Sequence, residues 1–398
     1  MGGFVLTFLM GGTLFCGFTA FYEPFIQEFK WSYTQVSIAF SIRGMEMGFL
    51  SPVAGILVDR FGAKLLLLAG TFLVGSSFLF LSQVNSLWAF YLAFVLMALG
   101  GSACSSTVLM AAVAAWFREN VGRAMGIVLS GFGLGGLLIA VIVYLIELYG
   151  WRQTLVVLGA ALLVLGMPMS FLVGQRPGKQ PESPRRPEDP LHPERQAQEK
   201  YCPGVPFALA IKNSDFWKIT SVESIRAANT IAIVTHVMPY LADLGLARTE
   251  AAWLATIIPV SSVGGRVFFG WLCDKFDKRR VWVTTLLFIA MGDILFNFAQ
   301  IKEIALLFVI VYSTAFGGAV TLRGAILRDY FGVLSFGRLH GLMMGMAALA
   351  GIVGVTGSAM VFDLLQDYRY AWSFFAAANI LAAWLAMKLK KLPPQAQG

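Results

Sequence analysis

The chain has 398 residues, of which 58% are hydrophobic and only 13% are charged. A soluble domain is about 45–50% apolar and about 25% charged, so this composition excludes an ordinary soluble protein and indicates an integral membrane protein. The net charge of +8 does not indicate a nucleic-acid partner, because the basic residues gather in loops on one side of the predicted spans. The four cysteines have no paired spacing, which argues against a disulfide framework or a metal site.

The apolar runs are about 20 residues long, the length of a membrane-crossing helix, and they lack the alternation of a β-barrel. We therefore predict an all-α membrane protein with about twelve transmembrane helices. The predicted spans are 3–23, 34–57, 65–84, 87–115, 124–147, 153–174, 215–241, 249–272, 281–299, 303–326, 338–362 and 371–390.

The sequence contains two copies of one half. Gly55 and Gly270 begin similar segments 215 positions apart, and Gly122 and Gly337 begin a second similar pair at the same offset. The stretch between the halves is rich in proline and charge and is typical of a linker. The predicted domains are a six-helix bundle at 1–174, a linker at 175–214, a second six-helix bundle at 215–390 and a tail at 391–398.

The loops differ sharply in basic residues. One side of the spans collects 58–64, 116–123, 175–214, 273–280, 327–337 and the C-terminus, and it holds most of the lysine and arginine outside the spans. The opposite loops carry only Lys30, Arg152, Arg248, Lys302 and Arg369. The positive-inside rule then places both termini and the central linker in the cytoplasm. We expect the protein to lie in an inner or plasma membrane.

A short loop motif occurs in both halves. The segment GILVDRFGAK at 55–64 resembles the loop signature of the major facilitator superfamily, and the segment at 270–280 is similar to a degraded second copy, with Asp277 where glycine is expected. The resemblance implies two pseudo-symmetric six-helix bundles. A carboxylate here can bind a helix N-terminus and pair with a cation, so the motif suits a latch that breaks when the halves move; the alternative is a static surface salt bridge. The predicted gate residues are Gly55, Asp59, Arg60, Gly62, Arg123, Gly270, Asp274 and Lys275.

Within that superfamily, three stretches resemble the monocarboxylate transporter and oxalate/formate exchanger branch. They are FKWSYTQVS at 29–37, GRVFFGWLCD at 265–274 and the loop that begins DYFG at 329. In the second stretch the resemblance implies that Arg266 binds the substrate carboxylate. Ser262 stands one turn before Arg266, where proton-coupled members tend to have aspartate, and the eleventh span has no lysine such as the oxalate exchanger uses. The coupling ion and the charge of the substrate therefore stay open.

Arg266 is the main candidate from the residues themselves. It lies eight residues before Asp274, roughly 12 Å along a helix, and so well inside the predicted membrane span. A buried guanidinium is expensive in lipid and marks a functional site, and its planar fork suits a carboxylate. The alternative is a structural ion pair with Asp274 or a loop carboxylate.

Two further pairs of charges lie inside predicted spans. Arg43 and Glu46 are three residues apart, and Glu223 and Arg226 repeat that spacing, which places each pair on one helix face. Each pair can be a structural ion pair in which the two charges neutralise each other. Alternatively, its carboxyl group can carry a proton; burial raises the pKa of such a carboxyl and a nearby arginine lowers it.

Weaker candidates complete the predicted site. Arg323 can be a second anion ligand, or it can pair with Asp293 or Glu223. Tyr22 and Ser262 join Arg266 and Arg323 in the predicted substrate site.

We expect a secondary active transporter of a small organic anion, most simply a monocarboxylate, which works by alternating access and is coupled to protons or to a counter-anion. The alternatives are transport of another organic solute, such as dicarboxylate exchange or efflux, with Arg266 structural, and, more remotely, a membrane receptor without transport. The sequence shows no nucleotide, metal or nucleophile motif, so we expect neither an enzyme nor a cofactor. The expected partners are the lipid bilayer, the substrate anion and protons or a counter-anion, and the resemblance implies a monomer.

Overall fold

The computed structural model describes residues 2–32, 35–36, 38–40, 42, 50–117, 120–174, 204–245 and 248–390. Among the described residues, the N-terminal half contains the α-helices α1 (Gly2–Met10), α2 (Tyr22–Phe29), α4 (Ser51–Phe61), α5 (Ala63–Leu81), α6 (Leu87–Ala103), α7 (Ser106–Trp116), α8 (Val121–Leu134), α9 (Leu138–Ala161) and α10 (Met167–Gly174). Short π and 3₁₀ turns at Gly11–Cys16 and Gly17–Phe21 join α1 to α2, and similar turns at Gly135–Leu137 and Leu162–Gly166 join α8, α9 and α10.

The C-terminal half contains α13 (Ser214–Asp243), α14 (Arg248–Lys275), α15 (Lys278–Phe296), α16 (Lys302–Phe331), α17 (Phe336–Leu365) and α18 (Arg369–Met387). Within the described residues, six helical stretches are long and apolar enough to cross a membrane: Ala63–Leu81, Leu87–Trp116, Val121–Val173, Lys302–Phe331, Phe336–Leu365 and Arg369–Met387. The all-α fold of two helical bundles predicted from the sequence is confirmed.

The helix ends repeat with the same offset as the sequence motifs. The helix α5 spans 63–81 and α15 spans 278–296, and both ends differ by 215 positions. The segment from the start of α6 to the end of α7 spans 87–116, and α16 spans 302–331, again 215 positions later. The two halves are therefore built from equivalent helices.

The main departures from the predicted spans lie in the N-terminal half. The predicted span 87–115 is interrupted between α6 and α7, at Cys104 and Ser105. The predicted spans 124–147 and 153–174 run on without a loop, and the chain bends at Gly150, whose φ of 77° suits a residue without a side chain.

Part of the predicted linker packs on the C-terminal half. Residues 175–203 lie outside the described residues. After them, Phe207–Ala210 forms the short helix α12, and the Val205 N–H donates to the Phe331 carbonyl at 2.9 Å. The end of the predicted linker is thus attached to the C-terminal bundle.

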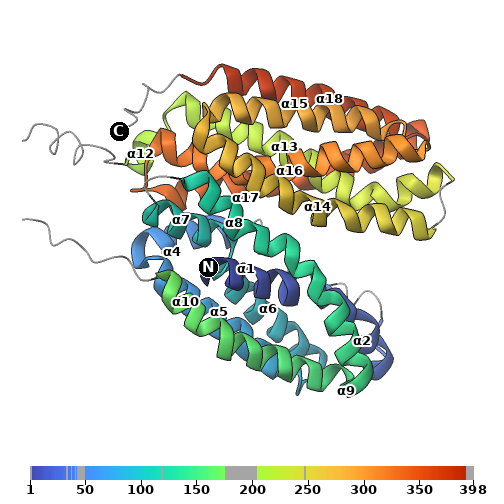
Figure 1. The fold of residues 1–398 in the computed structure, drawn as a ribbon. Coiled ribbons are helices and arrows are strands. Elements are labelled where there is room, and N and C mark those ends of the chain that lie inside the picture. The colour runs from blue at the N-terminus through green and yellow to red at the C-terminus, as the bar shows by residue number, and fades with distance from the viewer. Residues whose placement is uncertain are drawn as a thin grey trace, which may run out of the picture.

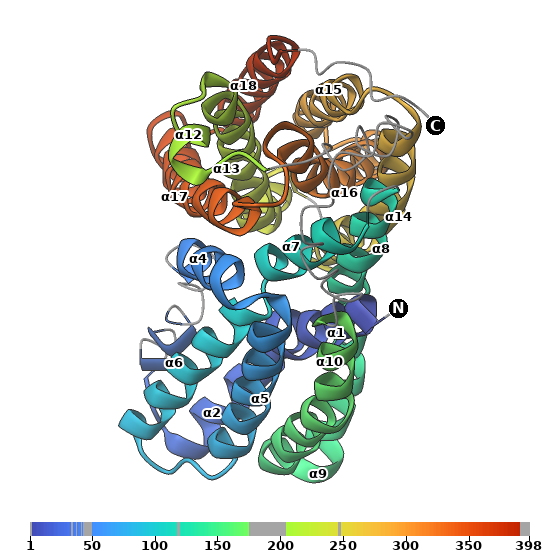
Figure 2. The same cartoon turned by 90° about the vertical axis from the view of Figure 1, so that its left-hand side faces the viewer.

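The two bundles lie one beside the other and approach closest near one end, as Figures 1 and 2 show. The helices α4, α7 and α8 of the first half pack there against α14, α16 and α17 of the second half. Buried side chains of both halves form one apolar cluster at this interface, including Met110 and Met125 with Leu322 and Ala325. We call this end, where α12 and the end of α10 also lie, the linker end.

Candidate functional site

The first copy of the loop motif binds the opposite half. Asp59, at the end of α4, accepts hydrogen bonds from the backbone N–H groups of Gly337 and Arg338 at 2.9 Å each. These groups begin α17, and a carboxylate is favoured at a helix N-terminus by the free N–H groups and the helix dipole. Arg338 Nε also lies 3.6 Å from Asp59 Oδ2. Burial leaves the pKa of Asp59 above its usual value, although the two amide hydrogen bonds and Arg338 lower it.

The second copy makes the reciprocal contact. Asp274, near the end of α14, accepts hydrogen bonds from the N–H groups of Gly122 at 2.9 Å and Arg123 at 2.8 Å, where α8 begins. The carboxylate of each half therefore caps a helix of the other half. We call these two contacts together the latch.

Glycine allows the latch helices to approach each other. A Cβ atom at Gly55 would lie 2.1 Å from the Gly337 carbonyl oxygen, and one at Gly270 would lie 2.6 Å from the Gly122 carbonyl oxygen. Because backbone atoms cannot turn aside like a flexible side chain, neither position accepts a side chain without moving a helix.

The basic residues of the motif make different contacts. Arg60 lies over the ring of Phe61 at 5.3 Å, and Lys275 lies over the ring of Trp271 at 4.3 Å. Gly62 has a φ of 79°, which turns the chain from α4 into α5. At the equivalent position Asp277 has a φ of −55° and its side chain caps α15 by accepting from the Arg279 N–H at 2.9 Å. The loss of glycine from the second copy is thus accompanied by a different turn.

Arg266 lies at the interface between the halves. Its side chain is 8% exposed, and Nη1 donates to the carbonyl of Leu129 in α8. The two helices are in close contact here, since a Cβ at Gly126 of α8 would lie 2.3 Å from the Arg266 carbonyl oxygen. Asp274, which the sequence offers as a partner for Arg266, uses its carboxylate to cap α8.

A buried cluster of three ionic residues lies inside the C-terminal half. Glu223 is fully buried, and its carboxylate receives two hydrogen bonds from Arg226, from Nε at 2.9 Å and from Nη2 at 2.6 Å. Arg323 of α16 donates Nη1 to the same carboxylate at 2.8 Å. One negative charge thus faces two positive charges, and the cluster keeps a formal charge of +1.

Polar contacts continue from this cluster to Asp293. Arg226 donates to the Thr230 hydroxyl at 3.3 Å, and the Tyr312 hydroxyl donates to Asn229 at 3.1 Å. Asn229 and Asn379 both donate to Asp293 Oδ2, at 2.5 and 3.0 Å. Asp293 is fully buried and its Oδ1 has no hydrogen-bond partner within the part of the chain that the structure describes. The arrangement fits a structural polar network that joins α13, α15, α16 and α18.

The remaining predicted site residues are spread apart. Ser262 is fully buried and donates its hydroxyl to the Pro259 carbonyl of its own helix at 2.6 Å. Tyr22 packs edge-on against Phe40, with ring centroids 5.1 Å apart, among the aromatic side chains of the N-terminal half. Arg43 and Glu46 lie outside the described residues.

Several polar residues of these networks were not candidates in the sequence. Asn229, Tyr312 and Asn379 join the network around Asp293, and His340 lies buried at the interface. Their only sequence signal is a polar side chain inside an apolar span, which also describes many residues that simply pack.

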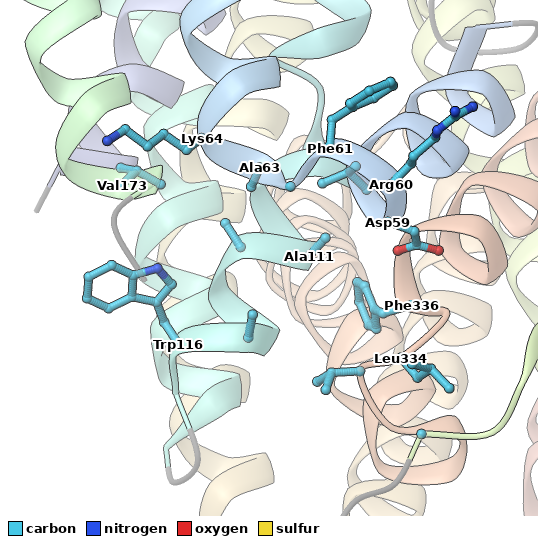
Figure 3. A pocket seen from close by; sticks show the side chains of 16 residues that line it. Asp59, Arg60, Phe61, Ala63, Lys64, Ala111, Trp116, Val173, Leu334 and Phe336 are labelled. Carbon is cyan, nitrogen blue, oxygen red and sulfur yellow. The ribbon is translucent and has the colours of Figure 1, made fainter. Parts of the chain in front are cut away.

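A pocket of about 840 Å³ lies beside the latch at the linker end. Figure 3 shows Asp59, Lys64, Trp116 and Phe336 around it, on segments of both halves. Neither Arg266 nor Arg323 lines this pocket. It is therefore separate from the buried arginines of the candidate substrate site.

Comparisons with known proteins agree with this architecture. The sequence profile of the Major Facilitator Superfamily matches residues 3–238 and 224–398, so both halves are recognised. The transporter FucP, solved in its outward conformation, superposes with a TM-score of 0.75 at 15% sequence identity and covers 98% of both chains. FucP is described as the fucose:proton symporter of E. coli.

Two curated relatives have similar sequences. Monocarboxylate transporter 12 of Mus musculus is 25% identical over 406 residues, which cover 96% of this chain and 83% of the relative. Monocarboxylate transporter 13 of Bos taurus is 26% identical over 372 residues, which cover 92% and 82%. The chain belongs to the Major Facilitator Superfamily of secondary transporters and resembles its monocarboxylate transporter branch.

Proposed function

We propose that the protein transports small organic anions, with monocarboxylates as the substrate class, by alternating access between its two halves. One observation carries the substrate class: among the described residues, the buried arginines in the interior of the C-terminal half outnumber the buried carboxylates there. Arg266, Arg323 and Arg226 are each at most 8% exposed, against the carboxylates of Glu223, which pairs with two of them, and of Asp293. The buried carboxylate of Asp215 pairs with Lys218 at the start of α13 and lies outside this interior. A site with such an excess favours an anion.

Arg266 is the proposed primary ligand. It lies where α14 meets α8 of the other half, so movement of one half against the other changes its surroundings. Arg323 is the proposed second ligand, because it is held by one hydrogen-bonded contact to Glu223 and its Nε has no hydrogen-bond partner among the described residues. Ser262 and Tyr22 are proposed as minor contributors to the cavity wall.

The latch is the proposed conformational gate. Its two carboxylate caps join the halves at the linker end, which we place in the cytoplasm because the basic loops gather there. The described conformation is then closed toward the cytoplasm. Breaking both caps would let the halves rock apart at this end, driven by a coupled proton or an exchanged anion.

A second candidate is transport of a different organic solute with Arg266 in a structural role. The hydrogen bond from Arg266 to the Leu129 carbonyl favours it, since that contact joins α14 of one half to α8 of the other.

Uptake into proteoliposomes separates the two candidates. Labelled lactate, pyruvate, formate and oxalate would be tested with and without an inward proton gradient, and with and without internal counter-anion. We expect saturable uptake of at least one monocarboxylate by the wild type, its loss in Arg266→Ala, and normal uptake in Arg280→Ala, an exposed basic control in α15. Equal uptake in Arg266→Ala and wild type would contradict the carboxylate site.

A further inference from the structure

A histidine is buried in the interface between the two halves. His340 of α17 has no exposed surface, and its Nδ1 lies 3.1 Å from Thr107 Oγ1 of α7. Thr107 Oγ1 in turn lies 3.0 Å from Ser51 Oγ of α4. The ring stacks on Phe336, with centroids 5.6 Å apart. One chain of hydrogen bonds thus crosses from the C-terminal half to the N-terminal half, three residues from the latch contact at Gly337.

The surroundings of His340 fit a neutral imidazole. Its Nε2 is buried and has no hydrogen-bond partner in the ranges that the structure describes. An imidazolium donates from both ring nitrogens, and a buried cation with an unsatisfied N–H is costly. A neutral ring with its proton on Nδ1 satisfies that nitrogen through Thr107 and leaves no unpaired N–H.

The charged groups around His340 do not supply a counter-charge. Arg323 of α16 and Glu223 of α13 act on it electrostatically, and Glu223 is already shared by two arginines. The helix α7 carries no titratable side chain. On α17 the other charged groups are Arg338 and Asp363, the latter 23 residues or about 35 Å along the helix from His340, and on α4 they are the latch residues Asp59 and Arg60. At the linker end of α13 and α16, Asp215 pairs with Lys218, Asp329 pairs with Lys278, and Arg328 donates to the Phe117 carbonyl. Arg43 and Glu46, which precede α4, lie outside the described residues.

We propose that His340 is a proton-binding site that becomes available only when the halves separate at the linker end. This inference rests on the alternating access of the proposed function. In the latched conformation the imidazole is sealed between α17, α4 and α7 and stays neutral. When these helices part, water reaches the ring, and it takes a proton directly from the solution on that side. Protons therefore favour the conformation that is open at the linker end.

The substitution at His340 distinguishes it from Asp59. Asp59 is a second titratable group at this interface, and its carboxylate accepts two hydrogen bonds in the latch. Because His340→Gln leaves Asp59 unchanged, a response to acid that comes from Asp59 persists in that variant.

The expected size of the pH effect follows from the pKa of an imidazole that is exposed to water in the open conformation. With an ordinary pKa of about 6.5 in the open conformation and no proton bound in the latched one, lowering the pH from 7.5 to 5.5 multiplies the ratio of open to latched molecules by about ten.

Distance measurements between spin labels test the proposal. Labels would be placed on cysteines at Phe61 and Phe276, which are 51% and 61% exposed and occupy equivalent positions in the two halves, in a chain without its four native cysteines. In the wild-type background we expect a roughly tenfold rise in the open population between pH 7.5 and 5.5. In His340→Gln, which stays neutral, we expect a change of less than about twofold. The matched control His236→Gln, at a histidine bonded to Val355 and Tyr368, keeps the full response.

Each other outcome is decisive. A wild-type response that is absent, or that closes the linker end in acid, overturns the proposal even if His340→Gln does not fold. A response that persists unchanged in folded His340→Gln also overturns it. Adding Asp59→Asn with Asp274→Asn checks the underlying movement separately: if that variant opens while pH has no effect, alternating access stands and only the role of His340 fails.

Discussion

The two halves have the same architecture but different interiors. At positions 215 residues apart, the N-terminal half has Phe8 where the C-terminal half has Glu223, Gly11 where it has Arg226, and Val108 where it has Arg323. Apart from Asp59 of the latch, every buried charged side chain that the structure describes lies in the C-terminal half. The first bundle forms without charges at these equivalent positions, so the fold of a half does not require them there, which supports the substrate-binding roles that we propose for Arg266 and Arg323.

The latch shows the opposite pattern. Asp59 and Asp274 are equivalent, and so are the glycine–arginine pairs that they cap, so the two halves contribute the same contact twice. The repeat is thus retained where the halves meet and is lost at the buried charges of the C-terminal half.

The largest expected effect tests the difference between the interiors of the two halves, namely the ionic cluster of Glu223, Arg226 and Arg323 in the C-terminal half. In Glu223→Gln, Arg226 and Arg323 would lose their shared counter-charge inside the bundle, and removing one partner of a buried ion pair costs about 3–5 kcal/mol. The equivalent substitution in the other half, Phe8→Leu, changes packing only and should cost less than about 1.5 kcal/mol. Thermal unfolding of the purified protein measures both, and equal losses would contradict the buried ion pairing of Glu223 with Arg226 and Arg323.

The next effect tests whether the latch is symmetric. Asp59→Asn and Asp274→Asn each remove a charged acceptor of two backbone N–H groups, and hydrogen bonds to charged groups contribute about 1.5–3 kcal/mol. Each variant should raise the population open at the linker end by tenfold or more, by similar amounts. The spin-label pair at Phe61 and Phe276 reports this population. A large effect from one aspartate alone would show that only one copy of the motif acts as a latch.

The smallest effect concerns the motif position that holds glycine in the first copy and aspartate in the second. Gly62 has a φ of 79° and a ψ of 159°, a region open essentially to glycine alone, so Gly62→Ala should destabilise the protein by about 1–3 kcal/mol. Asp277 has an ordinary φ and caps α15, and Asp277→Gly should cost only a few tenths of a kcal/mol. Chemical unfolding of the two variants compares them. A larger loss of stability in Asp277→Gly than in Gly62→Ala would show that the two turns are not distinct.

The sequence alone predicted the fold well, because the features that mark the helices are local and occur in both halves. Apolar runs marked the helices, and the offset between Gly55 and Gly270 marked the two halves. The break at Cys104 and Ser105 escaped prediction, since both sides are apolar and no proline or charge marks the turn.

The site was less predictable, because its partners are chosen by three-dimensional packing. The sequence offered Arg323 two acids, Asp293 and Glu223, and only the arrangement of α13 against α16 selects Glu223. Likewise, the motif suggested that Asp59 binds a helix N-terminus, but the identity of that helix as α17 depends on how the halves meet. His340 gave no signal beyond a polar side chain inside an apolar span, as its burial arises from α4 and α7 of the other half.

The most direct test of the account is equilibrium binding of labelled pyruvate and lactate to purified wild type and to Arg266→Lys. A lysine keeps the positive charge but lacks the planar fork that holds two carboxylate oxygens. We predict saturable binding to the wild type, an affinity at least tenfold weaker in Arg266→Lys, and an unchanged affinity in the exposed control Arg280→Lys. The same affinity in Arg266→Lys as in the wild type would contradict the claim that the arginines of the C-terminal half recognise the substrate anion.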